Sequence, residues 1–189
     1  MFYKLEPMQS KDRDGRLPQS ESYIVGTLAL MQREVGLHAV EIGTFYGETT
    51  TNIARAMPCH HVLTVDLPEG CEQSFAVHEN DKRLALLKKE PQFGEDVRDR
   101  IQQIYADSAS MELSKLLEIG FAFIDGSHTY EYAHNDFNKI SPLLVNGGMV
   151  VFHDVMGGVG KAVQEIIDST PRWLWSAYGG TSLVWGVKL

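Results

Sequence analysis

The chain has 189 residues, 43% of them apolar and 22% charged, which suits one globular domain and argues against disorder. Its formal net charge of −8 argues against sequence-independent binding to nucleic acid, because a phosphate backbone repels such a surface. Two cysteines, Cys59 and Cys71, are too few for a disulfide scaffold and favour a reducing, cytoplasmic setting. We also expect no membrane segment, since no apolar run reaches about 18 residues.

An arm and one helix are predicted at the start of the chain. Residues 1–19 are polar and rich in turn-forming residues, which is typical of an arm or lid without regular structure. Ser20 can cap a helix over 20–36, in which apolar residues recur every three or four positions and Gly36 ends the pattern. With a core over 37–189, the chain is predicted to form a single domain.

From residue 37 onward, short apolar runs alternate with helical patterns. The runs are rich in Val, Ile or Phe, end on a polar residue, and cover 37–43, 61–67, 101–108, 121–127 and 149–155. Apolar residues at helical spacing occupy 49–57, 82–89, 111–118, 130–144 and 159–168. This alternation is typical of a parallel sheet that helices cover on both faces.

The C-terminal segment departs from this alternation. The runs 172–178 and 181–189 are separated by Gly179 and Gly180, and they predict two strands of an antiparallel hairpin. The sequence therefore predicts an α/β fold with five parallel strands followed by an antiparallel pair.

Each predicted parallel strand ends close to an acidic residue. In an open parallel sheet, ligands bind at the carboxyl ends of the strands, so these residues are candidates for one shared site. The acids at this edge are Glu41, Asp66, Asp107, Asp125 and Asp154.

The loop after the first strand is a second candidate feature of the site. Its glycines, Gly43 and Gly47, would let a ligand approach the backbone closely. The spacing differs from the G-x-G-x-x-G pattern that places a pyrophosphate on a helix N-terminus. A ligand with an ammonium group and a ribose but no phosphate would suit the nearby carboxylates, and Asp66 is placed to bind the ribose hydroxyls.

Three segments, VEIGTFYGETT, FIDGSHTYEYAHNDF and GGMVVFHDV, resemble a known family. From about residue 35 onward the chain resembles the class I S-adenosylmethionine-dependent methyltransferases. Within that class, the three segments are similar to a small family that includes macrolide-sugar O-methyltransferases and cephalosporin-hydroxylase-like proteins. The resemblance implies a Rossmann-like methyltransferase fold, with a seven-stranded, mostly parallel sheet, an antiparallel C-terminal hairpin and helices on both faces.

The resemblance also implies S-adenosylmethionine as cofactor and suggests which residues bind it. These residues are Glu41, Gly43, Thr44, Tyr46, Gly47, Thr49, Asp66, Asp107, Ser108 and Asp125. Glu41 would hold the methionine part, Asp66 the ribose hydroxyls, and Asp107 the exocyclic amine of the adenine.

A divalent metal ion, Mg²⁺ or Mn²⁺, is implied in the same way. Its ligands would be Asp125 and Asp154, with His153 standing where relatives often have a carboxylate or an amide, which leaves the ligand set open. His128 matches the position of the proposed general base, and Asp125 is the second residue assigned to catalysis. A bound metal would lower the proton affinity of a hydroxyl, and a neutral histidine could take its proton.

These features favour an S-adenosylmethionine-dependent O-methyltransferase for a small hydroxylated substrate, such as a sugar, a phenol or a natural product. An NAD(P)-dependent oxidoreductase would explain the sheet and Asp66, although not the missing third glycine or the Asp125–His128 spacing. A non-catalytic S-adenosylmethionine-binding protein is the third reading, since fold does not guarantee activity. Asp66 could instead cap the following segment, Glu41 could pair with a nearby cation, and Asp125 and Asp154 could be ordinary loop acids or helix caps. His128 could be a helix-start residue with local hydrogen bonds, and His153 a structural partner. A homodimer is expected only because symmetric dimers are common.

Overall fold

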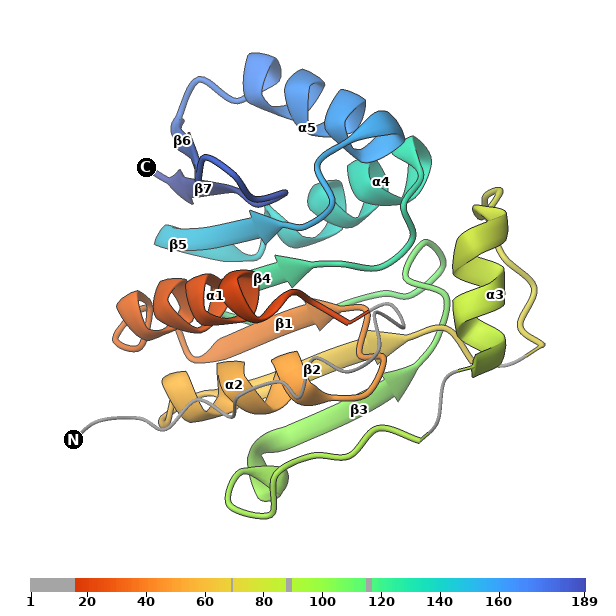
Figure 1. Ribbon diagram of the computed structural model, residues 1–189. Coiled ribbons are helices and arrows are strands. Elements are labelled where there is room, and N and C mark those ends of the chain that lie inside the picture. The colour runs from red at the N-terminus through yellow and green to blue at the C-terminus, as the bar shows by residue number, and fades with distance from the viewer. Residues whose placement is uncertain (1–15, 69, 88–89, 115–116) are drawn as a thin grey trace.

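Seven strands form one sheet in the part of the chain that the computed structural model describes, residues 16–68, 70–87, 90–114 and 117–189 (Figure 1). The strands are β1 (His38–Ile42), β2 (His61–Asp66), β3 (Ile101–Tyr105), β4 (Ile119–Ile124), β5 (Leu144–Phe152), β6 (Trp173–Ala177) and β7 (Val184–Lys188). Their spatial order is β3-β2-β1-β4-β5-β7-β6. Neighbours among β1 to β5 are parallel, and β7 runs antiparallel to both β5 and β6. The predicted fold class is confirmed.

Two pairs of helices cover the sheet. Helices α1 (Gln19–Met31) and α2 (Glu48–Ala56) pack on one face, and α4 (Tyr130–Ile140) and α5 (Gly157–Ser169) pack on the other (Figure 1). The central strand β4 is buried at every position, because side chains that alternate between the two faces all meet a covering helix. This burial explains why the central strands are continuous apolar runs.

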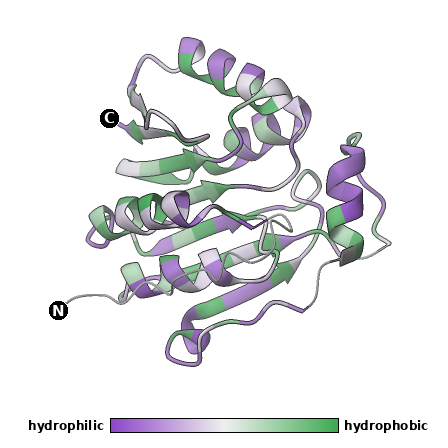
Figure 2. Ribbon diagram, in the orientation of Figure 1, coloured by the Kyte–Doolittle hydropathy of each residue, from purple (hydrophilic) through white to green (hydrophobic). Residues whose placement is uncertain are grey.

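Helix α3 (Glu79–Leu87) covers neither face of the sheet. It stands beyond the edge toward which the arrowheads of the parallel strands point (Figure 1). Figure 2 shows that its first part is hydrophilic, in contrast to the apolar central strands. Helix α3 is therefore positioned to form one wall of a site at the carboxyl ends of the parallel strands.

Four of the predicted helices after residue 37 are present with shifted ends. The segments 49–57 and 159–168 correspond to α2 and α5 within two residues at each end. Helix α3 starts before the predicted residue 82, and residues 88–89 lie outside the described part. Helix α4 ends before the predicted residue 144, which instead begins β5. No helix in the described ranges is both long and apolar enough to cross a bilayer.

The prediction of a helix over 111–118 is wrong, because no helix occurs at the described residues of this segment, 111–114 and 117–118. Its apolar side chains, including Met111 and Leu113, pack against the core from an irregular connection. The Nζ of Lys139 donates hydrogen bonds to the carbonyl oxygens of Ser108, Ala109 and Met111. These carbonyls therefore accept from a side chain of α4 rather than from a helix of their own.

Helix α1 is shorter than predicted, since it begins at Gln19 after Pro18 and ends at Met31. Gly36 lies beyond the helix, in a left-handed conformation with φ +66°. A Cβ atom there would come within 2.6 Å of the backbone nitrogen of Gly120, so the chain needs glycine where it crosses the start of β4. Residues 1–15 of the predicted arm lie outside the described part.

Candidate active site

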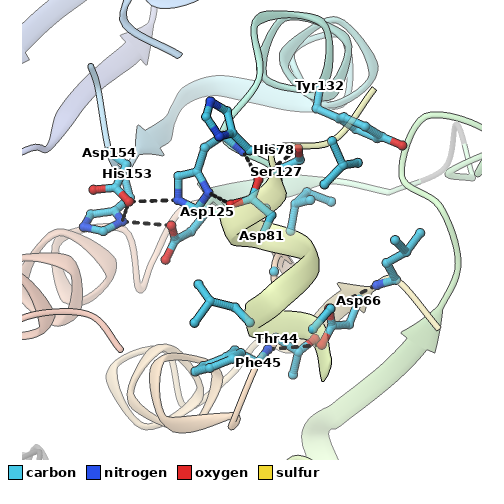
Figure 3. A pocket seen from close by; sticks show the side chains of 18 of the residues that line it. Thr44, Phe45, Asp66, His78, Asp81, Asp125, Ser127, Tyr132, His153 and Asp154 are labelled. Carbon is cyan, nitrogen blue, oxygen red and sulfur yellow. Dashed lines mark hydrogen bonds and ion pairs between the residues drawn. The ribbon is translucent and has the colours of Figure 1, made fainter. Parts of the chain in front are cut away.

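A pocket of about 800 Å³ opens at the carboxyl ends of the parallel strands, and Figure 3 shows part of its lining. Its walls include residues after all five strands as well as residues of α3. The predicted site residues that line it are Gly43, Thr44, Tyr46, Thr49, Asp66, Asp107, Ser108, Asp125, His128, His153 and Asp154. Glu41 and Gly47 are not among the lining residues. The topology thus brings most of the candidates to one cavity.

The loop after β1 passes very close to the end of β4. Gly43 has φ +99°, and a Cβ atom on it would lie 2.1 Å from the carbonyl oxygen of Asp125. Gly47 precedes α2 with φ +80°, and a Cβ atom there would lie 2.8 Å from the ring of Phe93. Both positions therefore require glycine, which allows the loop to turn sharply around the pocket.

Two pocket residues other than glycine also have a left-handed backbone. Phe45 and Asp154 both have φ +49°. Non-glycine residues adopt this conformation at a cost of about 1–3 kcal/mol, and such strain concentrates at functional sites. In this chain the two strained residues lie at opposite ends of the pocket. Phe45 lies beside Asp66, and Asp154 lies beside His128 and His153.

Asp66 and Asp107 are held by backbone hydrogen bonds at the ends of β2 and β3. The carboxylate of Asp66 accepts from the backbone nitrogens of Phe45 at 3.2 Å and Leu67 at 3.0 Å. Asp107 accepts from the backbone nitrogen and hydroxyl of Ser74 at 2.8 and 2.6 Å, and from the backbone nitrogen of Ala109 at 2.9 Å. Burial favours neutral Asp107, but these hydrogen bonds outweigh it and hold its pKa below the ordinary value.

Glu41 lies under the loop instead of facing the pocket. Its side chain is fully buried, and its carboxyl group accepts hydrogen bonds from the hydroxyls of Thr50 and Thr64. Thr64 also shares a hydrogen bond of 2.7 Å with Thr44, which does line the pocket. Burial raises the pKa of Glu41 to about 8, so it is protonated and neutral at pH 7. Direct contact between Glu41 and a cofactor stays a prediction.

We expect the wild-type protein to lose stability as the pH rises from 4.5 to about 8, and a Glu41→Gln variant to lose much less. Over this range the folded chain keeps a proton on Glu41 that the unfolded chain releases. One such proton changes the free energy of unfolding by about 1.4 kcal/mol per pH unit. Urea denaturation at several pH values measures the slope, with the exposed Glu34→Gln as control. Equal slopes for Glu41→Gln and wild type would contradict this role.

His128 and His153 each bridge a pair of carboxylates at the end of the pocket opposite Asp66. Figure 3 shows Asp81, Asp125, His153 and Asp154 close together at this end. The Nδ1 of His128 lies 2.6 Å from Oδ1 of Asp81, and its Nε2 lies 2.8 Å from Oδ2 of Asp154. The Nδ1 of His153 lies 2.8 Å from Oδ1 of Asp125, and its Nε2 lies 2.7 Å from Oε2 of Glu21. The acids after β4 and β5 are therefore each joined to a histidine.

These carboxylates favour the charged form of both rings. Hydrogen bonds that the ring donates to Asp154 and Asp81 raise the pKa of His128 to about 10, against the opposing effect of burial. Burial opposes the charge on His153 as well, but the carboxylates around it, chiefly Asp125, raise its pKa to about 9. Hydrogen bonding from His128 in turn lowers the pKa of Asp154. Without a ligand, both histidines are therefore cations at neutral pH.

Comparison with known protein families identifies the chain. A family model described as a methyltransferase domain matches residues 40–155, which include the loop after β1, Asp66, Asp107 and the segments around His128 and Asp154. The chain belongs to this methyltransferase family.

Solved structures of other proteins have the same fold as this methyltransferase. A Staphylococcus aureus protein assigned as a caffeoyl-CoA O-methyltransferase has a TM-score of 0.66 and 16% identity, covering 92% of this chain and 85% of its own. The O-methyltransferase TomG from Streptomyces achromogenes, solved in complex with SAM, has a TM-score of 0.64 and 16% identity, with coverages of 92% and 81%. An O-methyltransferase from Bacillus cereus, solved in complex with SAH, has a TM-score of 0.64 and 15% identity, with coverages of 92% and 83%.

Three residues of the methyltransferase could hold a metal ion. Asp125, His128 and Asp154 each offer one ligand atom, and these atoms lie within 4.8 Å of one another. Two carboxylate oxygens and one imidazole nitrogen fit Mn²⁺ or Fe²⁺, whereas the two acids alone suit Mg²⁺. His153, whose place among the ligands the sequence left open, lies behind Asp125 with both ring nitrogens on carboxylates.

Sequence reasoning missed two residues of this methyltransferase site, Glu21 and Asp81. Glu21 lies in the first turn of α1 and Asp81 in the first turn of α3. Acidic residues are common in the first turn of helices, because they interact favourably with the helix dipole. Neither position therefore carries a sequence signal that distinguishes a partner of an active-site histidine from an ordinary helix-start acid.

Proposed function

We propose that this methyltransferase transfers the methyl group of S-adenosylmethionine to a hydroxyl group of a small molecule. One observation carries the proposal: one pocket joins the loop after β1 and the acids after β2 and β3 to the cluster of Asp125, His128 and Asp154. The loop after β1 and the acids after β2 and β3 suit a nucleoside cofactor, whereas the cluster of Asp125, His128 and Asp154 suits activation of a hydroxyl. Both reactants would therefore meet in one cavity. The related structures solved with SAM or SAH support the choice of cofactor.

The cofactor would occupy the ends of β1, β2 and β3. Asp66 would accept hydrogen bonds from the ribose hydroxyls, and Asp107 with Ser108 would face the adenine. The loop from Gly43 to Tyr46 would approach the methionine part. The excess of carboxylates in the pocket complements the positive charge of a sulfonium group, which a phosphate-containing dinucleotide does not carry.

The proposed reaction is a displacement at carbon. The acceptor oxygen forms a bond to the methyl carbon as the bond from that carbon to sulfur breaks, and S-adenosylhomocysteine leaves. The proton of the hydroxyl goes to Nε2 of His128, the nitrogen that now faces Asp154. His128 must be neutral to accept it, so the ring first releases its own Nε2 proton to solvent, and the acceptor hydroxyl then takes the place of Asp154 at Nε2. Asp125 and Asp154 would hold a divalent ion, whose charge would lower the proton affinity of the hydroxyl.

The acceptor is proposed to be small. Cofactor and acceptor would share a cavity of about 800 Å³, which leaves room for a single sugar, phenol or natural-product ring system. Cys59 and Cys71 are both free thiols, which is compatible with the reducing, cytoplasmic setting that we propose. A homodimer stays a prediction that sedimentation would check.

Titration calorimetry tests the cofactor directly. We expect S-adenosylmethionine to bind the wild-type protein and an Asp66→Asn variant to bind it about 10-fold more weakly, because an amide replaces one carboxylate acceptor with a donor. The exposed Asp168→Asn variant on α5 is the matched control and should bind as wild type does. Binding of NAD without binding of S-adenosylmethionine would instead favour the oxidoreductase.

A further inference from the structure

Asp81 makes contacts with His128 that a structural surface acid would not need. Its Oδ1 accepts from the ring Nδ1 at 2.6 Å, and its Oδ2 accepts from the backbone nitrogen of the same residue at 3.0 Å. The hydroxyl of Ser127 approaches that second oxygen at 3.4 Å. One carboxylate thus holds both the backbone and the ring of His128.

We propose that Asp81 is the positioning residue of His128, and that through it α3 controls how the ring of His128 faces the pocket. The proposal rests on the proposed role of His128 as general base. With its Nδ1–H directed to Asp81, the ring has one orientation left, in which Nε2 points to Asp154 and the reacting end of the pocket. A base that is oriented by a third group in this way is a common arrangement in catalysis.

Helix α3 both lines the pocket and carries Asp81, the residue that holds the ring of His128. Asp81 contacts Ser127 and His128 in the loop after β4, and it lines the pocket together with Asn80, Lys82 and Leu84. The side chain of Asp81 is only 12% exposed, although it lies in the hydrophilic first part of a helix that covers neither face of the sheet (Figure 2). A helix that closes the wall of the pocket therefore also fixes the ring of His128.

Proton NMR of the ring N–H groups tests the contact without an acceptor. His153 donates its ring hydrogen bonds to Asp125 and Glu21 and not to Asp81, so its ring protons are an internal reference for an intact fold. We expect Asp81→Ala to remove the low-field Nδ1–H signal of His128 and to keep those of His153. The Glu79→Ala variant changes the same helix outside the pocket lining and should keep both. Persistence of the His128 signal in Asp81→Ala overturns the proposal.

Methyl transfer to 3,4-dihydroxybenzoate, a simple phenolic probe, tests the consequence for turnover. We expect Asp81→Ala to lower kcat about 10–100-fold and to leave the KM for S-adenosylmethionine within about twofold. In a His128→Ala background the same change should have no further effect, because Asp81 acts through the ring. Equal losses in both backgrounds would show a purely structural role and overturn the proposal.

The two proposals fail in different ways. If His128→Ala keeps wild-type turnover, the general-base role is lost, while the NMR signals still decide whether Asp81 orients the ring. If His128→Ala lowers turnover but Asp81→Ala keeps both wild-type turnover and the His128 signal, His128 is still supported as the general base. The positioning role of Asp81 is then rejected.

Discussion

Replacing His128 with alanine is expected to lower methyl transfer by about 10²–10⁴-fold, the range that a well-placed general base supplies. The ring is held between Asp81 and Asp154 at the end of the pocket away from Asp66, so its loss should leave the cofactor site intact. Transfer of labelled methyl groups to a panel of phenols and sugars measures the rate. Calorimetry should give an affinity for S-adenosylmethionine within about twofold of wild type.

The same variant separates the two chemical roles open to His128. If the ring acts as base, the His128→Ala variant keeps its affinity for Mn²⁺, and Asp154→Ala loses it. If the ring is a metal ligand, both variants lose affinity for Mn²⁺ together. His134→Ala, a histidine on α4 that stacks on Tyr130 outside the pocket lining, is the control for removal of an imidazole. Unchanged turnover in His128→Ala would contradict the base role.

Replacing Gly43 with alanine is expected to cost about 3–5 kcal/mol of stability and to abolish cofactor binding. Two physical effects add: a side chain at φ +99° is strained, and its Cβ would meet the carbonyl oxygen of Asp125 at 2.1 Å. That oxygen belongs to backbone at the end of β4, so the clash can be relieved only by moving the loop away from the sheet. Chemical denaturation measures the loss of stability.

Gly147→Ala separates the two effects. Gly147 has φ +83°, but nothing lies within 4 Å of a Cβ atom built there. Its replacement should therefore cost only the backbone strain, about 1–2 kcal/mol. Similar losses for the two variants would mean that the close approach of Gly43 to Asp125 is relieved without cost, contrary to our expectation.

The strand pattern made the sheet and most of the pocket predictable. A parallel strand covered on both faces must be apolar throughout, and β4 displays this in its sequence. Because the carboxyl ends of such strands share one edge, Asp66, Asp107, Asp125 and Asp154 could be placed together without a structure.

Other contacts of the site could not be predicted, because they depend on how segments outside the sheet dock. Glu41 ends up beneath the loop rather than in the pocket, since its side chain points to Thr50 on the face covered by α2. Asp81 and Glu21 reach the histidines only because the first turns of α3 and α1 lie beside the strand ends. The segment 111–118 has helical spacing, yet its described residues follow an irregular path in which the carbonyl of Met111 accepts from Lys139. Tertiary packing overrides local pattern at each of these positions.

The hydrogen bond from the backbone nitrogen of Ser182 to Glu21 has a consequence for biosynthesis. It measures 2.8 Å and joins residues 161 positions apart, so the carboxylate that supports His153 is held by the segment just before β7. Contacts of such long sequence separation form late, because loop closure must precede them. A ribosome-bound chain that has emerged only as far as α5 would hold its cofactor-binding strands and still lack this anchor. The acidic end of the site is therefore completed only when the final hairpin has folded.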